Sequence, residues 1–248
     1  MPVVFVHGNP ETAAIWDELR THLKRKDVIA LSPPGFGAPV PDGFGATSDE
    51  YVAWLAAELT RIDGPIDLVG HDWGGGHVMR IACERPELVR SWASDIAGVF
   101  QPDYVWHDMA QVWQTEGAGE TAVAGMAGAP KEARVAQFTG LGMSPAAAEN
   151  VAAAVNDEMG RCILALYRSA AQPRLAELGK LLPQAAAKPG LVIIASEDHY
   201  VGGEALARRS AEQAGAQVTV LDGLGHWWMC QVPKRGEAML DAFWSALA

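Results

Sequence analysis

The stretch Val69-Gly70-His71-Asp72-Trp73-Gly74-Gly75-Gly76 decides how the rest of the chain is interpreted. A short apolar run precedes it at residues 66–69, and an apolar pattern with helical spacing follows it at residues 78–83. A glycine-flanked turn between a strand and a helix holds its central residue at strained backbone angles and lifts that side chain above the end of the sheet. The stretch therefore predicts that the Asp72 carboxylate is presented at the start of a helix.

The chemistry expected of Asp72 is nucleophilic. The free N–H groups and the partial positive charge at a helix N-terminus favour an ionised carboxylate. Such a carboxylate attacks saturated carbon by displacement, which produces an ester of the protein itself. The simpler interpretation is a glycine-rich turn in which Asp72 only caps the helix, and the motif alone does not exclude it.

Strand and helix patterns alternate on both sides of this stretch. Helices are expected at residues 13–24 and 49–62, the second beginning with a capping box of Thr47 and Glu50. Such alternation is typical of a parallel, doubly wound α/β sheet. The predicted strands lie at residues 3–6, 28–31, 66–69, 91–96, 191–195 and 218–221, and the later helices at 204–214 and 233–247.

Residues 100–187 interrupt this alternation, because they contain no apolar run that indicates a strand. We interpret them as several short helices that fold over the carboxyl edge of the sheet as a cap. The remaining residues, 1–99 and 188–248, then form the α/β core. The segment is rich in alanine, glycine and methionine, with interspersed aromatic residues Tyr104, Trp106, Trp113, Phe138 and Tyr167.

A second group of candidate residues lies near the end of the chain, in Gly223-Leu224-Gly225-His226-Trp227-Trp228. This stretch follows the last predicted strand. In an open α/β sheet the loops after the carboxyl ends of the strands converge on one crevice. We therefore expect His226 to reach Asp72, although the two are far apart in the sequence.

Two aspartates are candidates for the third member of a nucleophile–acid–histidine group. The acid would orient the His226 imidazole and stabilise its protonated form. Asp198 follows the strand at 191–195, and Asp95 lies at the end of the strand at 91–96. We prefer Asp198 and keep Asp95 as the alternative.

The turn His7-Gly8-Asn9-Pro10 follows the first predicted strand. The backbone N–H groups of Asn9 and Trp73 could converge there as an oxyanion hole. Hydrolysis of an aspartyl ester needs such a hole, because water attacks the carboxyl carbon of Asp72. The alternative is that these residues form only a turn.

Composition limits the classes of function. The chain has 248 residues, which suits one α/β domain with an insertion. Hydrophobic residues make up 49% and charged residues 20%, which is typical of a globular protein. The net charge of −11 argues against nucleic acid and anionic membrane surfaces as partners. Residues 1–6 are apolar but too few for a signal peptide or a membrane span.

Cysteine and histidine spacing indicates neither a disulfide framework nor a metal site. The three cysteines, Cys83, Cys162 and Cys230, lie far apart, so reduced thiols and a cytoplasmic location are expected. No metal or other cofactor is predicted, because no H-x-x-x-H or carboxylate spacing occurs. The histidines besides His226 are His7, His22, His71, His77, His107 and His199.

Three short stretches, taken in their order along the chain, resemble the motifs of the α/β-hydrolase family. They are His7-Gly8-x-Pro10, Gly70-x-Asp72-x-Gly74 and Gly225-His226. The aspartate at the nucleophile position resembles the nucleophile of epoxide hydrolases and of haloalkane and haloacetate dehalogenases. The stretches 70–75 and 225–227 look most like epoxide hydrolases, and the resemblance covers the whole chain.

The resemblance to epoxide hydrolases also implies roles for cap tyrosines. Tyr167-Arg168 is similar to a Tyr-Arg pair of that family, in which the tyrosine donates a proton to the epoxide oxygen. A second cap tyrosine usually assists it. Tyr104 is the only other tyrosine in the predicted cap, so the resemblance implies this role for it.

The sequence departs from that family in several ways. The family normally has two further strands ahead of the His-Gly motif, so we expect about six strands and a small cap. Asn9 beside Trp73 instead resembles the pair that holds the halide in some haloalkane dehalogenases, and Asp95 resembles an acid position used there. Haloacetate dehalogenases have arginines just after the nucleophile, where this chain has Trp73 and Gly76. Haloacetate dehalogenation is therefore discounted.

The sequence is thus interpreted as an epoxide hydrolase that needs no cofactor. Asp72 would open the ring, Tyr167 with Tyr104 would supply the proton, and His226 with Asp198 would activate the water that releases a diol. The expected partners are water and a small apolar organic substrate, with the protein a monomer or homodimer. Alternatives are a haloalkane dehalogenase, in which Trp73 and Asn9 hold the halide, and a hydrolase-fold binding protein with little turnover.

Overall fold

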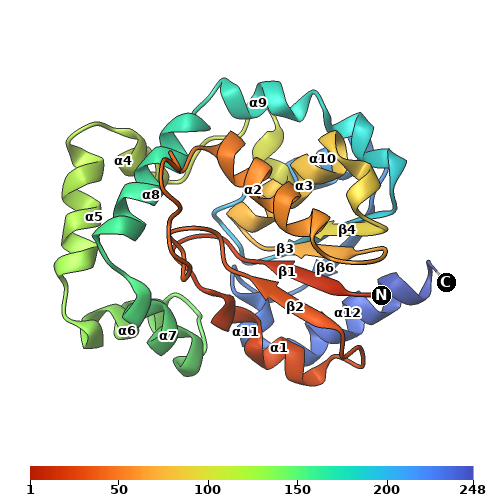
Figure 1. The fold of residues 1–248 in the computed structure, drawn as a ribbon, viewed down its shortest axis with the longest axis horizontal. Helices are drawn as coiled ribbons and strands as arrows, with labels where there is room; N and C mark the ends of the chain where they lie inside the picture. Colours follow the sequence, from red (N-terminus) through yellow and green to blue (C-terminus); the bar gives the residue numbers. More distant parts are fainter. Residues whose placement is uncertain (248) are drawn as a thin grey trace.

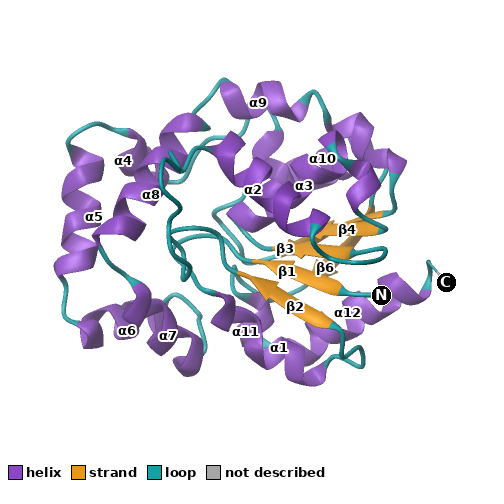
Figure 2. Ribbon diagram, in the orientation of Figure 1, coloured by secondary structure: helices purple, strands orange, loops and turns teal. Residues whose placement is uncertain are grey.

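The computed structural model describes residues 1–247, which contain one six-stranded sheet (Figures 1 and 2). Its strand order is β2-β1-β3-β4-β5-β6, and every neighbouring pair is parallel. The predicted α/β-hydrolase-like sheet of about six strands is therefore confirmed. The strands are β1 (Val3–Val6), β2 (Val28–Leu31), β3 (Asp67–Gly70), β4 (Ser91–Ser94), β5 (Gly190–Ala195) and β6 (Gln217–Leu221).

Helices cover both faces of this sheet (Figure 1). One face carries α2 (Ser48–Thr60), α3 (Trp73–Glu84) and α10 (Gly203–Gln213), and the other carries α1 (Asp17–His22), α11 (Trp228–Gln231) and α12 (Pro233–Ser245). Because helices cover both faces of the sheet, β1, β3, β4 and β5 are buried along their whole length.

The strand register aligns the loops that follow the strands. Val6 at the end of β1 pairs with Gly70 at the end of β3, and Gly70 pairs with Ser94 at the end of β4. The residues that follow these three strands consequently lie at the same edge of the sheet, where ligands bind in parallel α/β proteins.

Between β4 and β5 the described chain contains helices and no strand. Most of these helices lie beyond the carboxyl edge of the sheet, at the left of Figure 1. We propose that this insertion, residues 100–187, is the cap of the molecule. Its helices are α4 (Asp108–Gln114), α5 (Ala118–Gly128), α6 (Lys131–Gly140), α7 (Pro145–Ala154), α8 (Asp157–Ser169) and α9 (Arg174–Gly179).

Several element boundaries differ from those expected. The helix expected at 13–24 is a 3-10 turn at Ala13–Trp16 followed by α1, and the strand expected at 91–96 ends at Ser94. The next residue, Asp95, accepts a hydrogen bond from the Asp72 backbone N–H through its carboxylate. The predicted capping box is confirmed, since Thr47 and Glu50 each accept a hydrogen bond from the backbone N–H of the other.

Ion pairs connect the insertion to the core. Asp49 on α2 accepts hydrogen bonds from Arg80 on α3 at 2.6 Å and from Arg174 on α9 at 3.0 Å.

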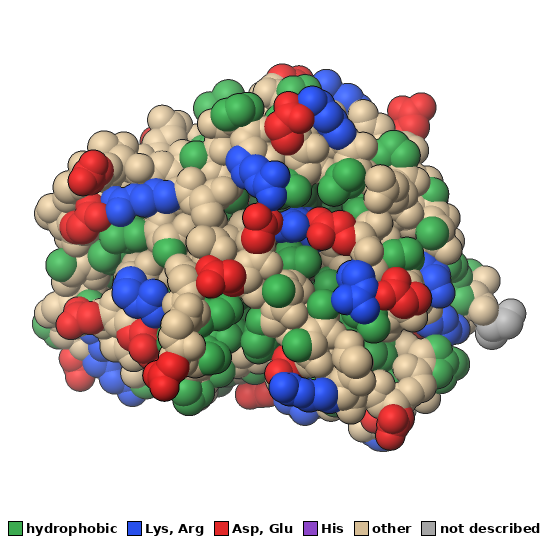
Figure 3. Space-filling view, turned by 45° about the horizontal axis from the view of Figure 1, so that its top comes forward, with side chains coloured by type: hydrophobic (Ala, Val, Ile, Leu, Met, Phe, Trp, Pro, Cys, Tyr) green, Lys and Arg blue, Asp and Glu red, His purple; other side chains and the backbone are tan. Residues whose placement is uncertain are grey.

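The surface shows no separation of charge on the face seen in Figure 3, where acidic and basic side chains are interspersed. Among residues 1–247, no helix combines the length and apolar character needed to cross a membrane.

Candidate active site

The turn between β3 and α3 has the strained geometry expected of it. Asp72 has φ 49° and ψ −131°, angles that a non-glycine residue rarely adopts. A Cβ on Gly70 would lie 2.5 Å from the Gly74 carbonyl oxygen, and one on Gly74 would lie 2.3 Å from the Val6 carbonyl oxygen. A Cβ on Gly8 would lie 2.0 Å from Asp72 Oδ1. Glycine at these three positions is therefore what allows the Asp72 side chain to occupy its place.

The two carboxylate oxygens of Asp72 have different surroundings. Asp72 Oδ1 accepts a hydrogen bond from the Asn9 backbone N–H at 2.9 Å, whereas Oδ2 lies 3.8 Å from His226 Nε2. The Trp73 N–H, the other predicted oxyanion donor, makes no hydrogen bond to Asp72 within residues 1–247. One oxygen is thus held by the backbone while the other faces the histidine.

The electrostatic environment of Asp72 differs from the sequence-based expectation. Burial raises the pKa of its carboxyl group to about 6, and the nearby His226 only partly opposes this rise. The helix N-terminus therefore does not lower the pKa below its usual value. Asp72 is nevertheless mostly ionised at neutral pH, and a poorly solvated carboxylate is a stronger nucleophile than one surrounded by water.

His226 lies between two aspartates. Its Nδ1 is 2.7 Å from Asp198 Oδ2, and Asp198 Oδ1 accepts a second hydrogen bond from the Tyr200 backbone N–H at 2.9 Å. Burial alone would lower the pKa of His226, but the Asp198 carboxylate raises it above its usual value. Asp198, the acid preferred in the sequence analysis, therefore lies in contact with the imidazole.

Asp95, the alternative acid, makes different contacts. Its Oδ1 accepts a hydrogen bond from the Asp72 backbone N–H at 3.0 Å. Its Oδ2 lies 2.5 Å from His71 Nδ1 and accepts from Trp228 Nε1 at 2.8 Å. Because none of these contacts is to His226, the structure does not place Asp95 as the partner of that imidazole. Asp95 instead stabilises the turn at Asp72 through its hydrogen bond with the Asp72 backbone N–H.

Glu11 and His71 extend this support, and the sequence analysis did not single out either residue. Glu11 Oε1 lies 3.1 Å from His71 Nε2 and accepts from Trp227 Nε1 at 2.5 Å, while Oε2 accepts from the Gly8 N–H at 2.9 Å. Burial lowers the pKa of His71, but Asp95 and Glu11 raise it well above its usual value. The residue next to the Asp72 carboxylate in the chain is therefore a buried imidazolium held between two carboxylates.

Glu11, His71 and His226 also lie close enough to be considered as metal ligands, with one possible ligand atom from each within 4.8 Å of the others. Sequence spacing could not reveal this group. Both ring nitrogens of His71 already lie against carboxylates, and an imidazolium has no lone pair to offer a metal. The contacts therefore fit an ion-pair network better than a metal site.

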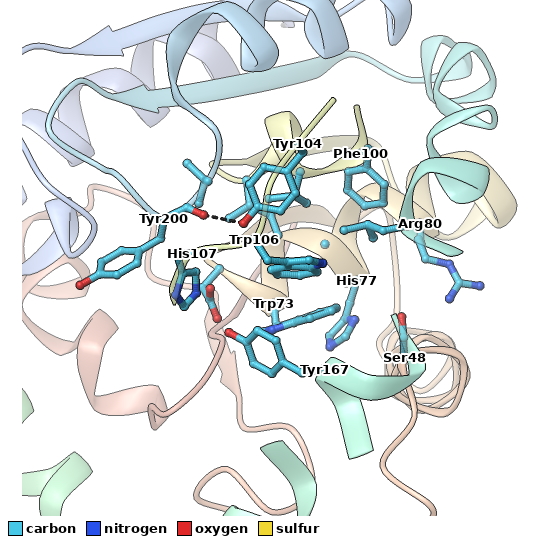
Figure 4. Close-up of a pocket in the computed structure, with 16 residues that line it drawn as sticks. Ser48, Trp73, His77, Arg80, Phe100, Tyr104, Trp106, His107, Tyr167 and Tyr200 are labelled. Carbon is cyan, nitrogen blue, oxygen red and sulfur yellow. Dashed lines mark hydrogen bonds between the residues drawn. The ribbon is translucent and has the colours of Figure 1, made fainter. Parts of the chain in front are cut away.

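The two tyrosines of the insertion differ in their contacts. The Tyr104 hydroxyl donates a hydrogen bond to the Tyr200 carbonyl oxygen at 2.7 Å, so its proton is already held by a backbone acceptor (Figure 4). The expectation that Tyr104 assists Tyr167 is thus not supported by its geometry. Tyr167 packs edge-on against the Trp73 ring at 5.2 Å and shares a cavity with Asp72.

Burial and the Asp72 carboxylate raise the pKa of the Tyr167 hydroxyl well above its usual value. The side chains of Trp73 and Asn9 near the phenol oxygen oppose this shift. The Asn9 amide does not reach regular hydrogen-bond geometry, since both its side-chain N and O are buried without a partner within residues 1–247.

The cavity that contains these groups is narrow and mostly aromatic (Figure 4). Its volume is about 20 Å³, room for little more than one water molecule, so an organic substrate must displace some lining side chains on entry. The sequence analysis named Trp106 only among the aromatic residues of the predicted cap and His107 only among the histidines without metal-site spacing, and both line the cavity. The wall is formed chiefly by Trp73, His77, Phe100, Tyr104, Trp106, His107, Tyr167 and Tyr200.

Comparison with known proteins agrees with this geometry. The sequence matches the alpha/beta hydrolase family over residues 3–235. The chain is an α/β-hydrolase. The parallel sheet and the strained turn at Asp72 agree with this assignment.

Among its relatives, this α/β-hydrolase is 38% identical to lipase LipV of Mycobacterium tuberculosis over 35% of the chain and 33% of that protein. It is 31% identical to an epoxide hydrolase of Caballeronia sordidicola over 36% of the chain and 29% of that protein. The chain thus matches only about a third of the length of these curated relatives.

One solved structure extends the similarity over the whole chain. A loop variant of the haloalkane dehalogenase DbeA of Bradyrhizobium elkanii superposes with a TM-score of 0.74 and 22% identity. The superposition covers 100% of this chain and 91% of that one. At this level of identity, the similarity establishes a common fold and not a common reaction.

The contacts of the two aspartates predict different consequences of their removal from the hydrolase. If Asp72 forms an ester with the substrate, Asp198→Ala should slow hydrolysis of that ester by about 10²–10⁴-fold, because His226 loses the carboxylate that orients it and stabilises its cation. Asp95→Ala should mainly lower the thermal midpoint of unfolding, because it leaves His71 Nδ1 and the Asp72 N–H without an acceptor. Single-turnover kinetics and thermal unfolding of both variants test this. An Asp95→Ala variant that accumulates ester while Asp198→Ala turns over normally would reverse the assignment.

Proposed function

We propose that this α/β-hydrolase is an epoxide hydrolase that forms a covalent ester on Asp72. The observation that carries the proposal is the buried Tyr167 hydroxyl, which shares the cavity with Asp72 and is approached by Trp73 and Asn9. Opening an epoxide produces an alkoxide, a strong base that needs a proton as the carbon–oxygen bond breaks. A phenol beside the nucleophile can supply that proton.

The groups around Tyr167 suit proton donation. Its raised pKa keeps the hydroxyl protonated until a strong base appears, and the donors on Trp73 and Asn9 stabilise the phenolate once the proton has left. The proton therefore stays on Tyr167 before ring opening and moves to the substrate oxygen during it. A phenol with no donors toward its oxygen would be a weaker acid.

The proposed reaction has two displacements. In the first, Asp72 Oδ2 bonds to an epoxide carbon, the carbon–oxygen bond breaks, and the released oxygen takes the Tyr167 proton. In the second, water attacks the Asp72 carboxyl carbon as His226 takes one of its protons, and the diol leaves with that proton. The other water proton returns to Tyr167, and the water oxygen remains in the Asp72 carboxylate.

The Asn9 N–H supports the second displacement. It already donates to Asp72 Oδ1, the oxygen that becomes the oxyanion when water adds to the ester. Asp198 supports it as well, since its carboxylate raises the pKa of His226 and so strengthens this base. The same two contacts would serve any ester of Asp72, whichever substrate formed it.

The cavity favours a small, uncharged substrate. Its wall is mainly aromatic and aliphatic, and the cationic side chain at its far end, Arg80, is already paired with Glu84 at 2.7 Å and Asp49 at 2.6 Å. A carboxylate on the substrate would therefore find no unpaired cation there. We propose small apolar epoxides as the substrate class.

Haloalkane dehalogenation is the second candidate, because one observation favours it. The Asn9 side chain is buried without a partner beside Trp73, and two neutral donors facing the same space can hold a departing halide. Dehalogenation would use the same Asp72 nucleophile and the same water activation. It would not need the Tyr167 proton, because a halide is a weak base.

The variant Tyr167→Phe separates the two candidates. It should reduce epoxide turnover by about 10²–10⁴-fold, the usual contribution of a general acid, because the ring remains and only the hydroxyl is lost. Dehalogenation should stay near the wild-type rate. The measurement is diol formation from aryl and alkyl epoxides in parallel with halide release from haloalkanes.

An epoxide activity that does not depend on Tyr167 would reject this proton donor while leaving Asp72 as the nucleophile. Halide release by the wild-type protein, with no diol from any epoxide, would favour the dehalogenase. Absence of both activities would favour a protein that binds small molecules with little turnover.

A further inference from the structure

We propose that His107 is the second hydrogen-bond donor to the epoxide oxygen, beside Tyr167. This inference rests on the proposed epoxide chemistry. It replaces the role that the sequence suggested for Tyr104, and it is argued from the contacts of Tyr104, His107 and Tyr167.

Tyr104 is not available for this role. Its hydroxyl has one proton, and that proton is donated to the Tyr200 carbonyl oxygen at 2.7 Å. To reach a substrate, Tyr104 would have to give up its hydrogen bond to the partly buried Tyr200 carbonyl oxygen, which is unfavourable. Of the two tyrosines in the insertion, Tyr167 is therefore the one whose hydroxyl is free to act on the substrate.

His107 has a fixed tautomer. It precedes α4, and its Nδ1 accepts a hydrogen bond from the Ala110 backbone N–H at 3.3 Å. An imidazole that accepts through Nδ1 must have its proton on Nε2. The position of the helix thus determines which nitrogen of His107 is the donor.

The ring of His107 is neutral. Burial lowers its pKa to about 4, as does the nearby His226, while Asp198 and Asp108 oppose this effect only partly. At neutral pH, His107 therefore presents an uncharged Nε2–H group. Because a neutral imidazole is a far weaker acid than a phenol, it donates a hydrogen bond and keeps its proton, while Tyr167 transfers one.

His107 lies at the same end of the cavity as Tyr167 (Figure 4). It lines the cavity with Asp72, its ring is edge-on to Tyr167 at 6.4 Å and to Tyr200 at 5.0 Å, and Tyr200 in turn contacts the His226 ring at 5.0 Å. Its Nε2 makes no hydrogen bond to any residue within 1–247. A donor at the nucleophile end of the cavity is thus left for a ligand.

Two substitutions at position 107 separate the donor from the helix cap. In His107→Asn, the short side chain keeps an oxygen that can accept from Ala110, since asparagine is a good N-cap, but it has no group at the position of Nε2. In His107→Gln, the longer side chain brings an N–H close to that position but loses the cap. A donor role and a purely structural role therefore predict opposite orders of activity.

The test measures ester formation by mass spectrometry of the intact protein in a His226→Gln background, where ester hydrolysis is blocked. His107→Asn should slow adduct formation from an epoxide by about 10²–10³-fold, the usual effect of removing one donor to a developing oxyanion. His107→Gln should retain most of the rate. Tyr104→Phe should slow the reaction much less than His107→Asn. Thermal unfolding of each variant shows whether it is folded.

Two outcomes would overturn the inference alone. One is adduct formation in His107→Asn at the rate of the parent protein. The other is the reverse order, with His107→Gln the slower variant or Tyr104→Phe the slowest of the three. If the parent His226→Gln protein forms no adduct with any epoxide, the proposed function fails, and the role of His107 fails with it.

Discussion

Asp72→Asn should abolish ester formation with every substrate. The amide that replaces the carboxylate is neutral and has no anionic oxygen, so it cannot displace a group from saturated carbon. The substitution is nearly isosteric, and the Asn9 N–H can still donate to the remaining oxygen. The measurement is single-turnover mass spectrometry of freshly purified protein, which should show no added mass.

The pKa of Asp72 provides a second test of its role. Because the carboxyl group titrates at about 6 and must be ionised to attack, the rate of ester formation should decrease as the pH falls through this value.

For the Asp72→Asn variant, near-wild-type activity of the fresh protein would reject the covalent mechanism. Slow recovery on storage would not, because the amide can hydrolyse back to aspartate.

His226→Gln should have the opposite effect, leaving ester formation intact and blocking its hydrolysis. The glutamine cannot take a proton from water, so the substrate should remain attached to Asp72. The 3.8 Å between His226 Nε2 and Asp72 Oδ2 in the wild-type protein leaves the imidazole beside the carboxyl group that water must attack. Intact-protein mass spectrometry should show one added substrate.

The mass of this adduct also identifies the chemistry. An epoxide adds its whole mass, whereas a haloalkane adds its mass without the halogen. Digestion should place the adduct on the peptide that contains Asp72. An adduct on another residue, or full turnover by His226→Gln, would contradict the assignment of the base.

The contacts predicted from the sequence follow local rules. A turn that places a non-glycine residue at φ 49° needs glycines around it, and those glycines are visible in the sequence beside Asp72. The parallel sheet then gathers the loops that contain His226 and Asp198 at one edge. Their 2.7 Å contact could therefore be anticipated, although the sequence left Asp95 as an alternative.

The contacts that were missed depend on packing between distant segments. Glu11 follows the His-Gly-Asn-Pro turn directly, but only the fold shows that it meets both His71 and Trp227. Likewise, the use of the Tyr104 hydroxyl and the tautomer of His107 depend on which backbone groups lie nearby. Residue spacing alone contains no such information.

The network of Glu11, His71 and Asp95 belongs entirely to the α/β core, whereas Tyr167 and His107 come from the insertion. In the proposed reactions, the groups that make and hydrolyse an aspartyl ester lie in the core, as do the Asn9 and Trp73 side chains that would hold a halide, whereas the proton donor to an epoxide oxygen lies in the insertion. Such a division lets evolution change the reaction by altering one segment while the nucleophile stays in place. Exchange of residues 100–187 between relatives is accordingly a route by which one scaffold could move between opening rings and removing halogens.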